Sequence, residues 1–232
     1  MEGEYLRIEI ESDELHRKIG VGIPKGALML IEGEDGSGKS IVCQRLLYGF
    51  LKNGHTVTYI CSEMTMKDFI SQMKSIEYRI HEFITTKKLL YIPMFPRVGK
   101  VVPREDFLYR LMNAEKLFEN EAIIIDTLNS LIKENFSKRD IFEFISFVKK
   151  IINSGRTIII TANPSLVDQK VLDLLRAICD IHFKLEIKSI GGDLKRFINI
   201  YRFRGSSIQI TGGIGFRVEP KIGFVIEIAA VA

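Results

Sequence analysis

The stretch that decides the fold is GEDGSGKS (33–40), which follows the apolar run ALMLIE (27–32). It matches the pattern G-x-x-x-x-G-K-[ST], whose glycines allow backbone N–H groups to turn toward a polyphosphate. In this pattern the lysine reaches the terminal phosphates, and the serine hydroxyl binds Mg²⁺. The sequence therefore predicts a nucleotide site formed by Gly33, Glu34, Asp35, Gly36, Ser37, Gly38, Lys39, Ser40 and Ile41.

The residues around this loop fit a strand before it and a helix after it. ALMLI (27–31) is a short apolar run of the kind that forms a buried strand. SIVCQRLLYGFLKNG (40–54) places apolar side chains on one helical face and ends at Gly54, a natural helix stop. The alternative is a surface loop rich in glycine and serine, and the strand–loop–helix context argues against it.

Composition and charge narrow the class of protein. The chain has 232 residues, of which 46% are hydrophobic, so it can bury the core of one domain, expected to span 1–232. Its net charge of +4 is too small to indicate a nucleic-acid partner. The N-terminus is acidic, unlike a signal peptide, and no apolar run approaches the roughly 20 residues of a membrane span.

The cysteines indicate buried thiols rather than a metal site or a disulfide framework. Cys43, Cys61 and Cys179 are far apart, and each lies in an apolar stretch. No cysteine and histidine cluster has the spacing of a zinc site. We therefore expect free, buried cysteines in a reducing cytosol.

Apolar strands alternate with helices beyond the phosphate loop. We expect strands at 56–61, 89–94, 122–126 and 156–163, and helices from about residue 67, over 106–120 and over 138–154. Ser137 and Asp140 fit the N-cap and third position of the last helix, and Gly155 fits its C-cap. Strands that are apolar throughout and separated by helices indicate a parallel sheet covered on both faces.

The pattern changes after residue 179. IHFKLEIKSI (181–190) and LKRFINIYRF (194–203) flank Gly191 and Gly192 and predict a hairpin. Two further short strands are expected, at 206–213 and 221–229. The predicted fold is an α/β phosphate-loop core with a mainly parallel central sheet covered by helices, extended by C-terminal antiparallel strands.

Two carboxylates are candidates for the chemistry of the site. Asp126 ends the apolar strand IIID and is expected to bind Mg²⁺ together with Ser40, although it could simply cap the next segment. The residue after it is Thr127 rather than the catalytic glutamate that many phosphate-loop ATPases have there. Glu63, in YICSEMT (59–65), is the candidate catalytic residue that would polarise water, or else it opens the next loop.

The stretch GVGIPKGALMLIEGEDGSGKS (20–40) resembles the opening of RecA-superfamily proteins of the KaiC-like branch. That branch has two successive glutamates where this chain has Glu63 and Met64, a departure that argues against efficient hydrolysis. YRFRGSS (201–207) is similar to the K-x-R-G segment of the branch. The resemblance implies that Arg202 and Arg204 contact the γ-phosphate of a neighbouring subunit in a homo-oligomeric ring; an exposed basic strand is the alternative.

Within this branch, SEMT (62–65) and DTLNS (126–130) resemble the archaellum accessory family, and the likeness covers nearly the whole chain. The resemblance implies a cytoplasmic regulator that binds ATP and Mg²⁺ with little or no hydrolysis. It also implies partners: the archaellum motor ATPase and the membrane platform. No nucleic-acid partner and no direct membrane span are expected. Whether the chain is an enzyme stays open, with binding favoured over turnover.

Two other functions are compatible with the motifs. One is a recombinase-like ATPase acting on DNA, against which the short loop PSLVDQK (164–170) argues. The other is a KaiC-like ATPase or kinase in signalling. Asn163 could sense the γ-phosphate or only form a turn, and the loop at 97–104 is either a partner surface or a solvated loop. The sequence leaves ring size and the adenine contacts open.

Overall fold

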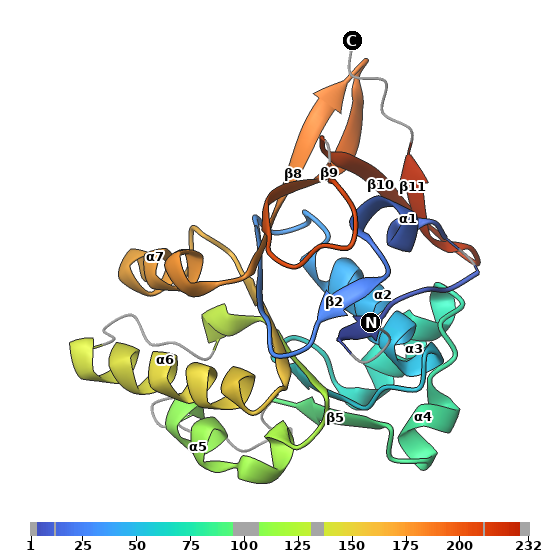
Figure 1. Cartoon of the computed structure of the whole chain (residues 1–232). Helices are drawn as coiled ribbons and strands as arrows, with labels where there is room; N and C mark the ends of the chain where they lie inside the picture. The colour runs from blue at the N-terminus through green and yellow to red at the C-terminus, as the bar shows by residue number, and fades with distance from the viewer. Residues whose placement is uncertain (1–3, 12, 95–106, 131–136, 211, 228–232) are drawn as a thin grey trace.

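The computed structural model describes residues 4–11, 13–94, 107–130, 137–210 and 212–227. Their main element is a sheet in which parallel strands run from the centre to one edge (Figure 1). In spatial order these are β3 (Leu28–Gly33), β7 (Thr157–Ala162), β6 (Ala122–Asp126), β4 (Val57–Cys61) and β5 (Leu89–Pro93). The phosphate loop therefore leaves the sheet from a central strand.

The other side of β3 carries the C-terminal strands. β8 (Ile181–Ile190) pairs parallel with β3 and turns into β9 (Asp193–Phe203), which returns antiparallel. β10 (Ile214–Glu219) and β11 (Gly223–Glu227) extend the same sheet by antiparallel pairing. This arrangement confirms the predicted α/β core with a mainly parallel sheet and an antiparallel C-terminal extension.

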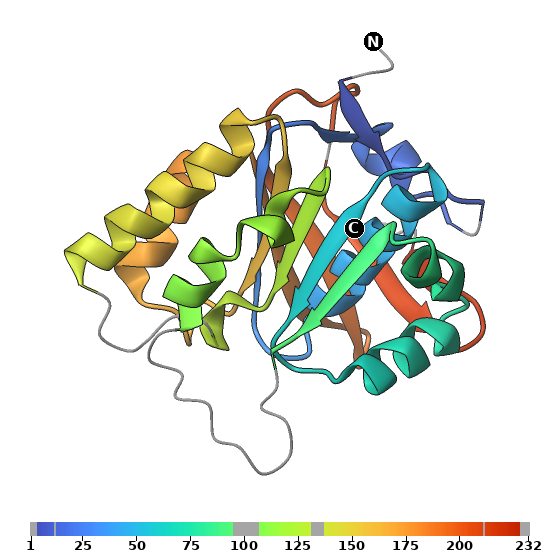
Figure 2. The same cartoon turned by 90° about the horizontal axis from the view of Figure 1, so that it is seen from below.

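Helices cover both faces of the parallel strands (Figures 1 and 2). One face carries α2 (Lys39–Lys52), α3 (Met66–Ser75) and α4 (His81–Thr85), and the other carries α5 (Phe107–Asn113), α6 (Lys138–Asn153) and α7 (Gln169–Ile178). Successive side chains of β3 alternate between the two cores: Met29 and Ile31 pack with α2, and Leu28 and Leu30 pack on the opposite face. Because both faces are buried, the strand is apolar throughout, and each such side chain contributes about 1.5–3 kcal/mol.

Local signals in the sequence set several element ends. Ser137 and Asp140 form the predicted capping box of α6, and Gly155, directly after the C-cap Ser154, has a φ of +84°. The three cysteines are buried and unpaired, as expected. Among the described residues, no helix combines the length and apolar character needed to cross a membrane.

Two predicted elements differ in the structure. The helix expected over 106–120 ends at Asn113, whose side chain donates to the Tyr109 carbonyl, and a short 3₁₀ turn, η2 (Glu115–Phe118), follows. The strand expected at 206–213 is wrong, since the described residues there pair with no strand. Ser206 Oγ bonds the backbone of Ile208 instead, and such local bonds compete with sheet pairing.

A short N-terminal unit packs beside α2. β1 (Tyr5–Arg7) pairs with β2 (Gly22–Pro24), and α1 (Leu15–Ile19) lies between them in the chain. Arg45 of α2 is fully buried, donates to both carboxylate oxygens of Asp13 and donates to the Ile8 carbonyl at 2.9 Å. This ion pair fixes the N-terminal segment to the helix that follows the phosphate loop.

Removing the acid of this pair should destabilise the chain strongly. Asp13→Ala leaves the Arg45 charge buried and unpaired, which costs about 3–5 kcal/mol in the free energy of unfolding. Urea denaturation followed by circular dichroism measures the change. The matched control is Glu14→Ala, which removes the exposed partner of Arg17 and should cost less than about 1 kcal/mol. Equal effects of the two variants would contradict this account.

Candidate functional site: a nucleotide pocket at the phosphate loop

The phosphate loop joins β3 to α2 through backbone that requires glycine. Gly38 is the N-cap of α2 with a φ of +98°, and a Cβ added there would lie 2.8 Å from the Phe216 ring. A Cβ at Gly33 would collide with Ser37 Oγ and the Leu185 carbonyl. The loop therefore lies directly against β8 and β10, and its N–H groups begin a helix whose positive end favours anions.

Lys39 and Ser40 lie at the start of α2 and face the loop and the sheet. Lys39 Nζ donates to the carbonyls of Gly33 at 2.8 Å and Glu34 at 3.0 Å. Ser40 Oγ donates to Asp126 Oδ1 at 3.2 Å. The structure thus brings together the lysine, the serine and the aspartate that the sequence placed in one site.

Asp126 ends β6 and is only 2% exposed. Its carboxylate accepts two further hydroxyl hydrogen bonds, from Tyr59 at 2.7 Å and from Thr161 at 2.9 Å. Tyr59 belongs to β4 and Thr161 to β7, so the strands on both sides of β6 hold this one side chain.

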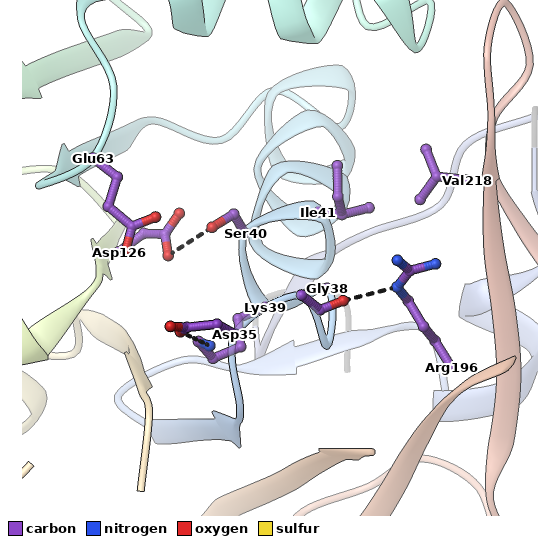
Figure 3. A pocket seen from close by; sticks show the side chains of 10 residues that line it. Asp35, Gly38, Lys39, Ser40, Ile41, Glu63, Asp126, Arg196 and Val218 are labelled. Atoms are coloured by element: carbon purple, nitrogen blue, oxygen red, sulfur yellow. Dashed lines mark hydrogen bonds and ion pairs between the residues drawn. The ribbon is translucent and has the colours of Figure 1, made fainter. Parts of the chain in front are cut away.

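A cavity of about 670 Å³ opens along the loop (Figure 3). Glu63 and Asp126 lie at one end of it, and Arg196 and Val218 at the other. Its lining consists of Asp35, Gly36, Gly38, Lys39, Ser40, Ile41, Glu63, Asp126, Arg196 and Val218. If a nucleotide lay along the loop, its terminal phosphate would be near Glu63 and Asp126. Its nucleobase would then be near Val218.

Glu63 follows β4 and points toward Asp126 (Figure 3). Partial burial raises the pKa of this carboxyl, the charges of Asp126 and Asp35 raise it further, and Lys39 opposes them. A carboxylate with a raised pKa is a stronger proton acceptor. The position therefore suits a group that polarises water beside a terminal phosphate.

A second layer of polar contacts holds the outer loop. Asn163, at the end of β7 and 2% exposed, donates to Asp35 Oδ1 at 2.8 Å, and its own Oδ1 accepts the Ser165 N–H at 3.0 Å. Ser165 Oγ donates to the Glu34 carboxylate at 2.8 Å. Asn163 thus forms the expected turn and also contacts the phosphate loop, while its sensing of a γ-phosphate stays a prediction.

Arg202 and Arg204 are held elsewhere in this chain. Arg202 Nη1 donates to the carbonyls of Arg176 at 2.8 Å and Cys179 at 2.7 Å, at the end of α7. Arg204 lies 3.6 Å from Asp180, and its side chain is 64% exposed. Neither residue lines the cavity beside Lys39. The loop at 97–104 lies outside the described residues.

Arg196 and Val218 are site residues that the sequence did not reveal. Arg196 of β9 donates from Nε to the Gly36 carbonyl at 2.9 Å, and its guanidinium lies between Gly38 and Val218 (Figure 3). Its terminal nitrogens have no hydrogen-bond partner among the described residues. No local pattern marks these positions, because only the fold brings the hairpin back onto the loop.

The donor set fits Mg²⁺ shared with a nucleotide. Ser40 and Asp126 offer oxygen atoms, the ligand type that Mg²⁺ prefers, at mutual hydrogen-bond distance. No group of three or more acidic, histidine or cysteine side chains in the described part of the chain could hold a metal alone. Mg²⁺ commonly takes one or two carboxylates and completes its shell with phosphates and water.

Fold and loop together define the class of phosphate-loop nucleotide-binding α/β proteins. The family model described as "ATPase: KaiC" matches residues 9–226. The archaeal flagellar ATP-binding protein FlaH of Methanocaldococcus jannaschii is 38% identical over 229 residues, covering 99% of this chain and 98% of that protein.

Solved structures agree with these sequence matches. The crystal structure of the flagellar accessory protein FlaH of M. jannaschii superposes with a TM-score of 0.89 at 37% identity, covering 97% of this chain and 100% of that one. A KaiC-like protein of Pyrococcus horikoshii, 17% identical, shares the fold with a TM-score of 0.74 and covers 96% of this chain and 98% of its own. The chain belongs to the KaiC-type ATPase family and, within it, to the FlaH family of archaeal flagella.

Glu32, the last residue before the loop, forms a buried ion-pair cluster. It is 1% exposed, and its oxygens accept bonds of 2.7 and 2.5 Å from Arg176 of α7. His182 Nε2 lies 2.7 Å from Oε1. Burial alone raises the pKa of this carboxyl, but Arg176 and His182 outweigh burial and hold the pKa at about 2. The end of β3 is thereby tied to α7 and β8.

This low pKa predicts a pH-dependent contribution to stability. Because folding lowers the pKa of Glu32 from its ordinary value of 4.5, the charged side chain stabilises the fold fully above about pH 4.5 and loses this effect as the pH falls toward 2. Glu32→Gln should therefore be less stable near neutral pH, and its deficit should shrink below about pH 4.5. Urea denaturation over this range measures the deficit.

The control for this measurement is Glu143→Gln, which removes an exposed partner of Arg139 and should change little at any pH. A deficit of Glu32→Gln that stays constant from neutral to acidic pH would contradict the assigned charge state.

Proposed function

We propose that this chain binds ATP with Mg²⁺ as a single nucleotide-binding unit and uses it mainly as a ligand that sets a conformation. The observation that carries the proposal is the convergence of the phosphate loop, Lys39, Ser40 and Asp126 on one cavity. The membership in the KaiC-type family, and the name of the FlaH relative, which describes it as ATP-binding, support the choice of ATP.

Each site residue has a proposed role. The loop N–H groups and Lys39 bind the phosphates, Ser40 and Asp126 bind Mg²⁺, and Glu63 faces the terminal phosphate. Ile41 and Val218 offer apolar contacts at the base end of the cavity. When bound, Mg²⁺ would neutralise part of the phosphate charge.

Two features favour holding ATP over hydrolysing it. Met64 stands where the KaiC-like branch has its second glutamate, so one acidic group is missing. Arg202 and Arg204 do not line the cavity of their own chain, so the positive charge that the resemblance assigns to these two arginines must come from a second copy. Where an arginine finger supplies that charge, its effect on the rate is about 10³–10⁵. A single chain lacks this contribution.

The biological setting is proposed from the relatives. The names of these relatives describe ATP-binding or accessory proteins of the archaeal flagellum. We propose that this chain is the corresponding regulatory subunit at the cytoplasmic face of the membrane. It would form a homo-oligomeric ring, with Arg202 and Arg204 at the neighbouring nucleotide, and would contact the motor ATPase and the membrane platform. Bound ATP then regulates assembly by favouring the state that binds it more tightly.

An active KaiC-like ATPase is the second candidate function. It is favoured by Glu63, whose carboxyl lines the cavity opposite Arg196 and has a raised pKa. Slow but sustained release of phosphate would support this candidate.

The binding proposal is tested with Lys39→Ala. Calorimetric titration with ATP and Mg²⁺ should show tight binding that weakens about 10- to 100-fold in this variant, because a charge-assisted contact of about 1.5–3 kcal/mol is lost. Lys52→Ala, at the exposed far end of α2, is the matched control and should bind like the unaltered chain. Equal affinity of Lys39→Ala and the control would refute the proposed site.

A further inference from the structure

Among the described residues, the side-chain carboxylate of Asp126 accepts hydrogen bonds only from neutral hydroxyl groups. Oδ1 accepts the hydroxyls of Ser40 and Thr161, while Oδ2 accepts the hydroxyl of Tyr59 alone. Lysine or arginine in any of these places would cancel part of the negative charge. Hydroxyls fix the plane of the carboxylate and leave its charge available to a cation.

Tyr59 reaches Asp126 from the adjacent strand. Cys61 of β4 is the register partner of Asp126, and Tyr59, two residues earlier, lies on the same face of the sheet. Its side chain is fully buried. Burial raises the pKa of its phenol well above the usual value, and the Asp126 charge raises it further, so Tyr59 remains a hydrogen-bond donor.

A cluster of aromatic rings connects Tyr59 to the segment that carries Glu63. The Tyr59 ring lies 5.0 Å from Phe69, and Phe69 lies 4.3 Å from Tyr91, measured between ring centroids. The Tyr91 hydroxyl donates to the Met64 carbonyl at 2.8 Å. The aromatic cluster of Tyr59, Phe69 and Tyr91 thus contacts both Asp126 and the residue after Glu63.

We propose that Tyr59 is a positioning residue for the metal: its hydroxyl sets the orientation in which Asp126 meets Mg²⁺. The inference rests on the proposed function, in which Mg²⁺ binds between Ser40 and Asp126. Without the Tyr59 hydroxyl, Oδ2 loses its one described donor, and only the hydroxyls on Oδ1 restrict rotation of the carboxylate about its Cβ–Cγ bond. Partners of this kind behind a metal ligand typically change metal affinity 10- to 100-fold.

The test is Tyr59→Phe, which keeps the ring stack and removes one oxygen atom. We expect ATP affinity measured in EDTA to equal that of the unaltered chain. In the presence of ATP, the Mg²⁺ concentration needed for half-maximal binding should rise about 10- to 100-fold. A fluorescent ATP analogue titrated with Mg²⁺ gives both values, and thermal unfolding checks that the variant is folded.

A double-mutant cycle distinguishes an effect of Tyr59 through Asp126 from a general destabilisation of the pocket. If Tyr59 acts through Asp126, the Mg²⁺ requirement of Tyr59→Phe combined with Asp126→Asn should match that of Asp126→Asn alone. Effects that multiply in the double variant would overturn the inference. Tyr78→Phe is the matched control, since Tyr78 is another buried tyrosine and its hydroxyl makes no hydrogen bond to Asp126, so the Mg²⁺ requirement should stay unchanged.

The outcomes also separate this inference from the proposed function. If Mg²⁺ strengthens ATP binding in the unaltered chain and Asp126→Asn raises the Mg²⁺ concentration needed for this effect, the proposed metal site is supported. A Tyr59→Phe variant that then behaves like the unaltered chain overturns the role of Tyr59 alone. If Mg²⁺ has no effect on the unaltered chain, the metal site itself fails, and the inference fails with it.

Discussion

The hydrogen bonds accepted by Asp126 join the separate parts of the nucleotide pocket. Ser40 comes from the helix after the phosphate loop, Tyr59 from β4 and Thr161 from β7. A buried carboxylate without such donors would lose several kcal/mol of solvation, so each element must lie where its hydroxyl reaches the acid. The position of one carboxylate therefore depends on the lengths and registers of three parallel strands and on the start of α2.

The sequence predicted the parts of the site that lie within single stretches of chain. GEDGSGKS (33–40) carries its own geometry, and IIID places Asp126 at a strand end, so both followed from local patterns. Arg196 and Val218 did not, because their place depends on how the β8–β9 hairpin folds back onto the loop. The prediction of a strand at 206–213 was wrong, since the Ser206 side chain bonds the nearby backbone of Ile208.

For Arg202 and Arg204, the sequence resemblance indicates contacts between subunits, whereas the structure shows their contacts within one chain. The resemblance assigns them to a neighbour's phosphate, whereas within the chain they cap the end of α7 and pair with Asp180. Releasing Arg202 would leave the carbonyls of Arg176 and Cys179 without this donor, at a cost of about 1–3 kcal/mol if they stay buried. The free energy gained from a phosphate contact in a ring must exceed the free-energy cost of releasing Arg202. Assembly and nucleotide state would then be linked through these two side chains.

The fate of a bound ATP molecule tests the central claim most directly. The chain is loaded with Mg²⁺ and ATP labelled at the γ-phosphate, excess unlabelled ATP is added, and the label that leaves is identified as intact ATP or free phosphate, alongside Glu63→Gln. If ATP is a ligand, the label leaves as ATP at the same rate from both proteins. Label that leaves the unaltered chain as phosphate, and does so only while Glu63 is present, would contradict the account and make this protein an ATPase.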